Sequence, residues 1–509
     1  MIVESAQQWW MSGEADKQTM MFRTERYAAL TIQKICLPNG FDSAGTDQAH
    51  DYQALGAQGV NHLTNKLMLA MFAPSRPFFR VAPGKAASAQ MKQQGIKDED
   101  LAPLLSATER AAVERLDELG QRPKLYATMR HLIIAGNVQL CLDEDNIRVI
   151  ALRNFCVKRD HSGRVHSNII KECVKFDELD PAVQAALPGK YNADTKVDHY
   201  RWIKWNYETS MYEMTQWVNE HQLPQPFNGR WTDEDCPYVI LTWDLADDSD
   251  YATGLVEEYL GDLEALSVLA EAIVDAAVLG TEFRWLVNPS GVTQAEDLAA
   301  SKNGDALSGK PEDIAPTSGG NAQNLQAAIE VSSIYEKRLS LAFMLQSALT
   351  RDAERVTAEE IRQNAMELET AFGGVYTSLA QTLQGKIARW LLKASGNTIT
   401  GTDMKVIVIT GLDALSRNGD LDNLRAAFGD LAQLTNAPPQ LLARLKYDPL
   451  VAFVGDGRGI DLRPYVMSDQ EYAAQQQQIA QQQAVQAGMQ QHAVTTADNG
   501  ANQQTPPTQ

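Results

Sequence analysis

One stretch restricts the fold more than any other: GLVEEYLGDLEALSVLAEAIVDAAVLG, from Gly254 to Gly280. Its apolar residues recur every three or four positions, which predicts one face of a single long α-helix. The charged residues of the stretch are all acidic: Glu257, Glu258, Asp262, Glu264, Glu271 and Asp275. Solvated helices usually mix both signs in i to i+4 pairs. The one-sided charge therefore indicates either a surface that repels phosphate or an ordinary acidic face in an acidic protein.

A second long helix is predicted from about Ala322 to Leu345, again with one apolar side. Between the two helices, residues 283–321 lose the helical period and contain turn-forming runs such as VNPSGVTQ and LSGKPED. The sequence therefore predicts two long helices on either side of a small insert of turns and short strands.

The next helix has a clear start signal. Thr357 and Glu360 have the spacing of a capping box, so we expect a helix from about Ala358. Arg351 and Arg355 lie in the connection before that helix, outside its apolar stripe. What the two arginines face depends on the whole molecule.

The first 250 or so residues mix helix and strand patterns. GAQGVNHLTNKLMLAMFA and ATERAAVERLDELG predict amphipathic helices, and the aromatic stretch that begins at residue 197 predicts a hairpin. Trp202, Trp205 and Trp217 of that hairpin suit sheet packing better than a base-stacking platform. Near the other end, VIVI predicts a strand, and the final 20 or so residues of the Gln-rich tail have too little apolar content to fold.

Composition excludes several classes of protein. The net charge of −20 argues against a protein that grips nucleic acid over a broad surface, although a protein that surrounds DNA without holding it remains possible. The longest apolar runs are far shorter than the ~20 residues that cross a bilayer, and the N-terminus lacks the basic flank of a signal peptide. Five scattered cysteines without a CxxC pair do not suggest zinc or redox chemistry. We expect a soluble protein made in the cytoplasm.

The sequence gives little support for catalysis. It contains no GxxxxGK[ST] loop, no HExxH, no GxSxG and no GxGxxG after a strand. The one enzymatic candidate is WDLADDSD, whose acidic residues Asp244, Asp247, Asp248 and Asp250 would have to hold a divalent ion for phosphodiester cleavage. Without a basic or histidine partner nearby, a solvated acidic loop is the better interpretation. We expect no enzyme activity, no cofactor and no metal.

Several stretches resemble, in the same order, the portal or head-to-tail connector proteins of short-tailed, autographivirus-like phages. They span roughly residues 50 to 430 and are GAQGVNHLTNKLMLAMF, HLIIAGNVQL, GLVEEYLGDLEALSVLAEAIV, LVNPSGVTQ, LSGKPEDI, RLSLAFML, ERVTAEEIR and ELETAFGGVYTSL. Each is weak alone, but together they are specific. The ends of the chain match this family poorly.

The resemblance implies a portal fold, mainly α-helical with an α+β wing, assembled as a closed ring of usually twelve subunits. It divides the chain into a wing (1–251), a first stem helix (252–282), a clip (283–321), a second stem helix (322–345), a tunnel loop (346–356), a long wing helix with the remaining wing and crown base (357–466), and a crown helix with a disordered tail (467–509).

The resemblance also implies a function and partners. Such a ring sits at one capsid vertex, where double-stranded DNA is packaged, retained and ejected. The expected partners are other copies of the chain, the terminase large subunit, a tail adaptor, and scaffolding and major capsid proteins, with no membrane. Assembly would take place in the bacterial cytoplasm and the product would be part of the virion.

Within this scheme, Arg351 and Arg355 become a small basic collar on the tunnel loop, and the six acidic residues of the first long helix become candidates for the channel lining. The clip candidates for partner binding are Asn288, Pro289, Gly291, Lys302 and Lys310. Two alternatives stay open: a helical capsid, scaffolding or tail protein without a DNA channel, and a metal-dependent nuclease that uses the Asp244 to Asp250 cluster.

Overall fold

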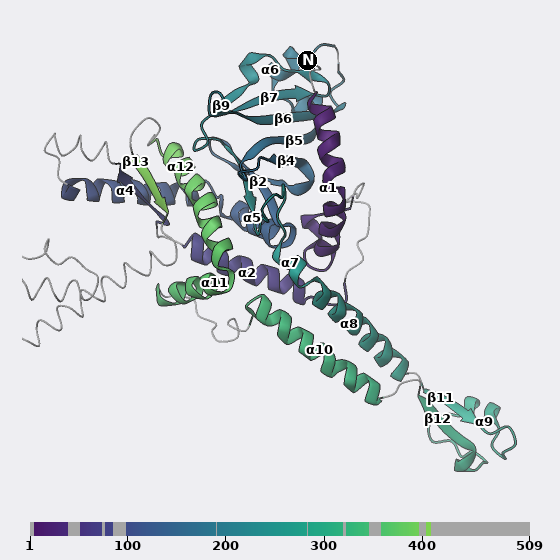
Figure 1. The fold of residues 1–509 in the computed structure, drawn as a ribbon. Helices are drawn as coiled ribbons and strands as arrows, with labels where there is room; N and C mark the ends of the chain where they lie inside the picture. Colours follow the sequence, from purple (N-terminus) through teal and green to yellow (C-terminus); the bar gives the residue numbers. More distant parts are fainter. Residues whose placement is uncertain are drawn as a thin grey trace, which may run out of the picture. The chain divides into compact units, whose positions relative to one another are not determined.

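The computed structural model describes residues 5–38, 51–73, 77–84, 98–189, 191–281, 283–318, 322–345, 358–396 and 404–408 (Figure 1). Its longer helices are α1 (Ala6–Ala29), α2 (Leu55–Met71), α4 (Asp98–Glu118), α5 (Arg122–Ala135), α8 (Leu260–Thr281), α10 (Ala322–Ala342), α11 (Ala358–Leu379) and α12 (Gly385–Ala394). None of the described helices combines the length and the apolar character that spanning a bilayer would require. Helix α11 begins where its start signal predicts.

The largest sheet is antiparallel and has six strands, in the order β4-β5-β6-β7-β8, with β9 also paired to β7. They are β4 (Phe155–Arg159), β5 (Val165–Lys175), β6 (Lys196–Asn206), β7 (Met211–Val218), β8 (His221–Gln222) and β9 (Gly229–Trp231). The predicted aromatic hairpin is β6–β7. Trp202, Trp205 and Trp217 are all buried, which confirms that they pack within the sheet.

Helix α1 lies against this sheet (Figure 1) and is fixed there by a buried lysine. Lys17 is 2% exposed, and its Nζ donates hydrogen bonds to the backbone oxygens of Leu152 (2.8 Å), Arg153 (3.1 Å) and Phe155 (2.6 Å). The Trp10 ring lies 4.9 Å from the same nitrogen. Burial lowers the pKa of Lys17, but three acceptors and an aromatic face satisfy the ammonium. Lys17 therefore ties α1 to the backbone just before and at the start of β4.

A three-stranded antiparallel sheet supplies the centre of the core. Its order is β10 (Tyr238–Thr242), β2 (Asn137–Leu142) and β3 (Ile147–Ala151). Every residue of the central strand β2 is buried, and α2 and α5 contribute fully buried side chains to the same core. A strand covered on both faces is expected to be continuously apolar, as VQLCL nearly is.

A two-stranded sheet joins distant parts of the chain. Strand β1 (Phe79–Pro83) pairs antiparallel with β13 (Met404–Val408), which contains Val406–Val408 of the predicted VIVI strand. Side chains of α12, such as Ile387 and Leu391, are fully buried in the main core. This sheet and the main core therefore draw on segments from both ends of the described chain.

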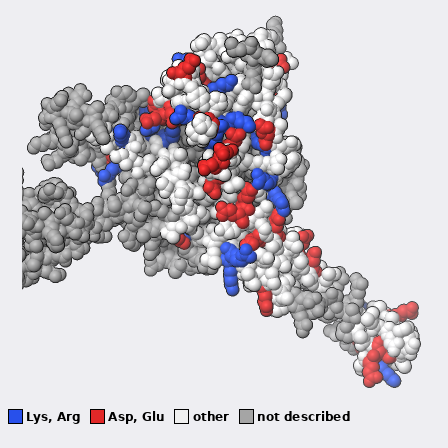
Figure 2. All heavy atoms as spheres, in the orientation of Figure 1, with Lys and Arg blue, Asp and Glu red and all other residues white. Residues whose placement is uncertain are grey.

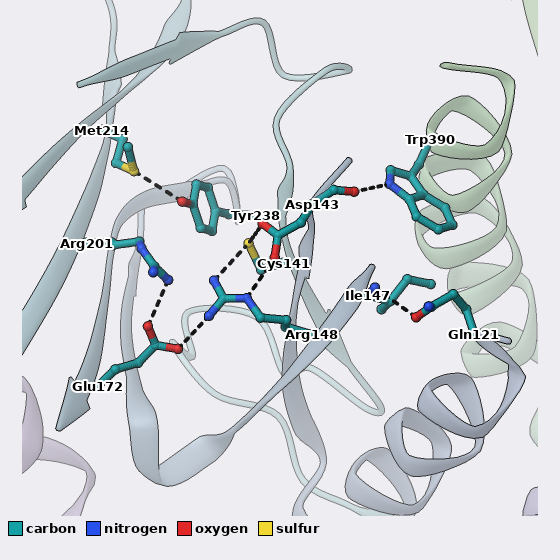
Figure 3. Close-up of polar contacts among 10 residues, drawn as sticks. All are labelled: Gln121, Cys141, Asp143, Ile147, Arg148, Glu172, Arg201, Met214, Tyr238 and Trp390. Carbon is teal, nitrogen blue, oxygen red and sulfur yellow. Dashed lines mark hydrogen bonds and ion pairs between the residues drawn. The ribbon is translucent and has the colours of Figure 1, made fainter. Parts of the chain in front are cut away.

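A polar network connects the two larger sheets and α12 (Figure 3). Arg148 of β3 pairs with Glu172 of β5 (Nη1 to Oε1, 2.9 Å), and Arg201 of β6 pairs with the other oxygen of Glu172 (3.0 Å). Arg148 also pairs with Asp143 (2.8 Å), whose backbone oxygen accepts a hydrogen bond from Trp390 Nε1 of α12 (2.5 Å). Because these pairs are partly buried, removing one partner would leave a poorly solvated charge on the other.

Buried histidines predict acid sensitivity. Burial lowers the pKa of His131 to about 4 and also lowers that of His199, whereas an unfolded histidine titrates near 6.5. Below pH ~6.5 the unfolded chain thus binds protons that the folded chain does not, so the free energy of unfolding should fall as pH drops toward 4. We expect urea midpoints to decrease between pH 7 and pH 5, and His131→Leu to weaken that decrease. A midpoint independent of pH in this range would contradict the prediction.

Candidate functional site

The two long helices lie side by side (Figure 1), and the first is interrupted near its start. Instead of one helix from Gly254, the chain forms α7 (Leu255–Glu258) and then α8, because Tyr259 leaves the helical conformation (φ −108°, ψ 15°). The prediction of a single uninterrupted helix is therefore wrong at this residue. Tyr259 packs near Phe343 at the end of the α10 segment, with ring centroids 6.2 Å apart.

The six acidic residues of this region fall into two groups. Half of them are neutralised by arginines from other elements: Glu257 pairs with Arg23 at 2.6 Å, Asp262 pairs with Arg338 at 3.1 Å, and Glu264 pairs with Arg26. These contacts fix α1 and α10 to the start of the acidic segment. Sequence reasoning could not see them, since the arginines lie far away in the chain.

The other three acidic residues, Glu258, Glu271 and Asp275, are exposed. Burial, with the nearby Asp244 carboxylate, raises the pKa of Glu258. Figure 2 shows the region of α8 and α10 as mostly uncharged surface with scattered acidic side chains and a basic group at its upper end. The exposed negative charge thus lies at the end of α7 and in the second half of α8.

Exposed apolar side chains share the surface of α8 with the acidic ones. Val268, Glu271, Asp275 and Val278 follow one another at spacings of three and four, so they lie on one face, and the two valines are 64% and 57% exposed. Large exposed apolar side chains also occur elsewhere on the pair: Val274 and Leu279 on α8, and Ile329, Val331, Ile334 and Leu341 on α10. So many exposed large apolar side chains on one helix pair indicate an interaction surface.

The insert between the helices contains β11 (Phe283–Val287), α9 (Ala295–Ala300) and β12 (Ile314–Ser318), with β11 and β12 antiparallel. Asp313 holds its loops together: Oδ2 accepts hydrogen bonds from Val292 N (3.0 Å), Thr293 N (3.3 Å) and Thr293 Oγ1 (3.2 Å). Gly291 is required beside it, because a Cβ there would lie 2.4 Å from the Asp313 carboxyl carbon.

Three of the predicted insert candidates shape a turn. Asn288 Oδ1 accepts a hydrogen bond from Ser290 N (3.1 Å), Pro289 occupies the next turn position, and Gly291 N donates to Asn288 O (3.0 Å). Within the insert, these residues build the loop that Asp313 fixes. A direct role in binding a partner is not needed to explain their presence.

The remaining candidates, Lys302 and Lys310, have exposed side chains. Their backbone N–H groups donate hydrogen bonds within the insert, from Lys302 N to Asp305 Oδ2 (2.7 Å) and from Lys310 N to Thr293 Oγ1 (3.0 Å). The insert also exposes large apolar side chains that sequence reasoning did not single out: Trp285, Leu286, Val292 and Leu307. A two-stranded ribbon without a covering layer leaves both faces open, so these residues are strong candidates for contact with another chain.

We expect Asp313→Ala to loosen the insert. The change leaves three donors without their shared acceptor, which should destabilise the insert locally by about 1–3 kcal/mol. Hydrogen exchange should accelerate between residues 288 and 313, with little change in the six-stranded sheet. Asp305→Ala, which removes one turn hydrogen bond, is the matched control and should have a smaller effect. Unchanged exchange in Asp313→Ala would show that the loops are held by other contacts.

Comparison with known proteins decides the family. Residues 28–466 match the family model described as bacteriophage head to tail connecting protein. The chain belongs to this family. The portal protein of Escherichia phage T7 is 33% identical over 96% of this chain and 92% of that protein. The portal proteins of Enterobacteria phages T3 and SP6 are 32% and 29% identical over 93% and 97% of the chain, and over 89% and 96% of their own lengths.

Comparison with solved structures adds little to the family assignment of this head-to-tail connecting protein. One of them, described as the neck of an empty GTA particle, aligns with 72% of this chain over 84% of its own length. The sequence identity is 13% and the TM-score is 0.38. That likeness is too low to support an argument.

The acidic residues of the nuclease alternative make structural contacts within this head-to-tail connecting protein. Asp250 accepts a hydrogen bond from Arg159 N (2.7 Å) and pairs with Lys158 (3.2 Å), and the backbone of Asp244 bridges to Thr253. Among the described residues, no group of three or more histidine, cysteine or carboxylate side chains is placed to hold a metal ion. The relatives are portal proteins, a structural class, and the family is likewise not enzymatic.

The predicted collar residues Arg351 and Arg355 lie outside the described residues.

Proposed function

We infer that this chain is a portal protein that acts at a capsid vertex of a short-tailed phage, where the genome is packaged and from which it is later ejected. The observation that carries this inference is the match over nearly the whole chain to the portal proteins of T7, T3 and SP6. The family model over residues 28–466 supports the same role at the junction of head and tail.

We further propose that the chain assembles into a closed ring of twelve copies. The exposed apolar side chains of α8 and α10 support this proposal, since a solvated helix pair rarely leaves so many uncovered. They lie on two neighbouring helices, so one subunit can present one surface to its left neighbour and a different one to its right. A heterologous contact of this kind gives a ring when its rotation closes.

In the proposed ring, α8 and α10 form the stem around the channel, residues 283–321 form the clip, and the sheets with α1, α2, α5 and α12 form the wing. Glu258, Glu271 and Asp275 would keep DNA phosphates away from the wall, because like charges repel and a wall of Lys and Arg would hold the duplex by releasing counterions. Glu257, Asp262 and Glu264 would contribute less, since each is paired within the chain.

We assign the partners by position. The clip, with exposed Trp285 and Leu286, would meet the terminase large subunit during packaging and the tail adaptor afterwards. The wing would face the scaffolding and major capsid proteins. Assembly in the bacterial cytoplasm would be followed by incorporation into the virion.

Imaging and complementation test this function together. Purified protein should form rings with a central opening wide enough for a DNA duplex in negative-stain images. The gene should also restore DNA-filled heads to a phage that lacks its own portal. Protein that stays without a ring, or forms sheets or tubes, would favour a capsid, scaffolding or tail protein without a channel.

Arg351 and Arg355 provide a prediction about DNA handling. If the tunnel loop faces the channel, Arg351→Ala with Arg355→Ala should leave ring assembly and melting unchanged, within the ~0.5 kcal/mol typical of surface substitutions. DNA retention should weaken or packaging should stall, more strongly at low salt, because the phosphates lose attractive partners. Arginines paired locally with Glu354, Glu359 or Glu360 would instead give a small stability loss and normal retention, measured as DNA released from filled heads.

A further inference from the structure

Helix α2 meets the ends of both stem helices at two glycines, Gly56 and Gly59. A Cβ added to Gly59 would lie 2.5 Å from Phe343, which follows α10 and is fully buried. A Cβ added to Gly56 would lie 3.3 Å from Leu263 of α8 and 2.4 Å from the backbone oxygen of Leu30. The contact between α2 and the stem is therefore close enough that even one methyl group would disturb it.

The same helix holds α11 by a charged contact. Lys66 Nζ lies 2.9 Å from Glu367 Oε2 of α11. The Lys66 side chain is 7% exposed and that of Glu367 is 44% exposed. Gly59 and Lys66 are two helical turns apart, so they lie on the same side of α2. The end of α10 and the middle of α11 are thus both located by one side of one helix.

The ion pair differs from the apolar contacts around it. Leu368 of α11 is fully buried, and Phe372 packs edge-on against Trp243 with centroids 5.5 Å apart. Apolar contacts tolerate small sliding of one helix along another, because dispersion has little directionality. A salt bridge from a buried ammonium fixes one point of α11 along and around α2.

We propose that Lys66 is a positioning residue of the portal: its buried ammonium fixes α11 relative to the stem helices and so sets how firmly the ring retains DNA. This inference rests on the proposed function, since only in a DNA-conducting ring does the placement of α11 affect DNA. Glu367 is the partner through which Lys66 acts.

Two substitutions separate positioning from simple stabilisation. Lys66→Met keeps a long side chain in the buried position and leaves Glu367 solvated, so the melting temperature of purified rings should stay near that of the wild type. Glu367→Gln removes the negative charge that balances the buried ammonium and leaves only a neutral amide acceptor, so the melting temperature should fall. Both variants should release DNA from filled heads roughly fivefold faster than the wild type, as a contact of ordinary strength would predict. Glu213→Gln is the matched control, because Glu213 is similarly exposed and pairs with Arg230 (2.8 Å) in the six-stranded sheet.

The experiment uses heads filled by complementation with each variant, incubated below the melting temperature of the rings. Faster DNA release in Lys66→Met with unchanged melting supports positioning. Wild-type retention in Lys66→Met, or in both variants, overturns it. Failure of the wild-type chain to give filled heads would overturn the proposed function itself, and the wild-type sample shows this before any variant is compared.

Discussion

Replacing Ile334 with aspartate should give a folded subunit that no longer closes into rings. Ile334 is 55% exposed on α10, on the same face as the exposed Val331 and Leu341. Burial of an unpaired carboxylate at a subunit contact is unfavourable by several kcal/mol, and about 2.8 kcal/mol already corresponds to a hundredfold change in each association constant. Because every contact in a ring is repeated, the loss should be close to complete. Mass photometry and negative-stain images would measure it.

The control for Ile334→Asp is Thr209→Asp, which adds the same charge to an exposed turn between β6 and β7. It should form rings like the wild type. Circular dichroism of both variants should match that of the wild type, since neither position is buried in the subunit. Normal rings from Ile334→Asp would remove this face of α10 from the proposed subunit interface.

The second large effect is expected in the clip. Trp285→Ser with Leu286→Ser should leave rings intact and abolish attachment of the tail adaptor. Both side chains are more than half exposed, and an exposed tryptophan on a small module has the character of an interface hot spot, whose loss commonly weakens binding by 2 kcal/mol or more, about thirtyfold. Cosedimentation of rings with the adaptor would give the affinity, and infected cells should accumulate heads without tails.

Glu296→Gln on α9, an exposed polar position of the same insert, is the control for the clip variant and should bind the adaptor normally. Normal tails on particles with the double serine substitution would exclude Trp285 and Leu286 from the adaptor contact. Dispersal of the rings would instead assign these two residues to contacts between neighbouring subunits.

Patterns within a short window predicted most of the elements. Helical spacing located α2, α4, α8 and α10, alternation of aromatic and polar residues located β6–β7, and the Thr357 and Glu360 signal placed the start of α11. These patterns depend on local physics, namely side-chain periodicity and the unsatisfied N–H groups at a helix start. The burial of the three tryptophans also followed from local composition.

Contacts between distant residues were beyond that reasoning. The sequence predicted no partners for the acidic residues that follow Gly254, because the arginines that pair with three of them lie in α1 and α10. The break at Tyr259 also escaped the helical spacing, because Tyr259 packs near Phe343, which is more than eighty residues away in the chain. Asp313 was missed because its role depends on loops twenty residues earlier, although an aspartate just before a strand is a frequent loop anchor.

The pairing of β1 with β13 has a consequence for synthesis on the ribosome. Strand β1 emerges early, yet its partner, Met404–Val408, is made only after α8, the clip and α10 have left the exit tunnel. The exposed valines and leucines of α8 and α10 therefore leave the ribosome while this sheet is still open. Chains whose ends pair late expose apolar surface to other nascent chains for longer. Slow translation beyond residue 345, or limiting chaperone, should therefore reduce the yield of usable subunits before any ring begins to assemble.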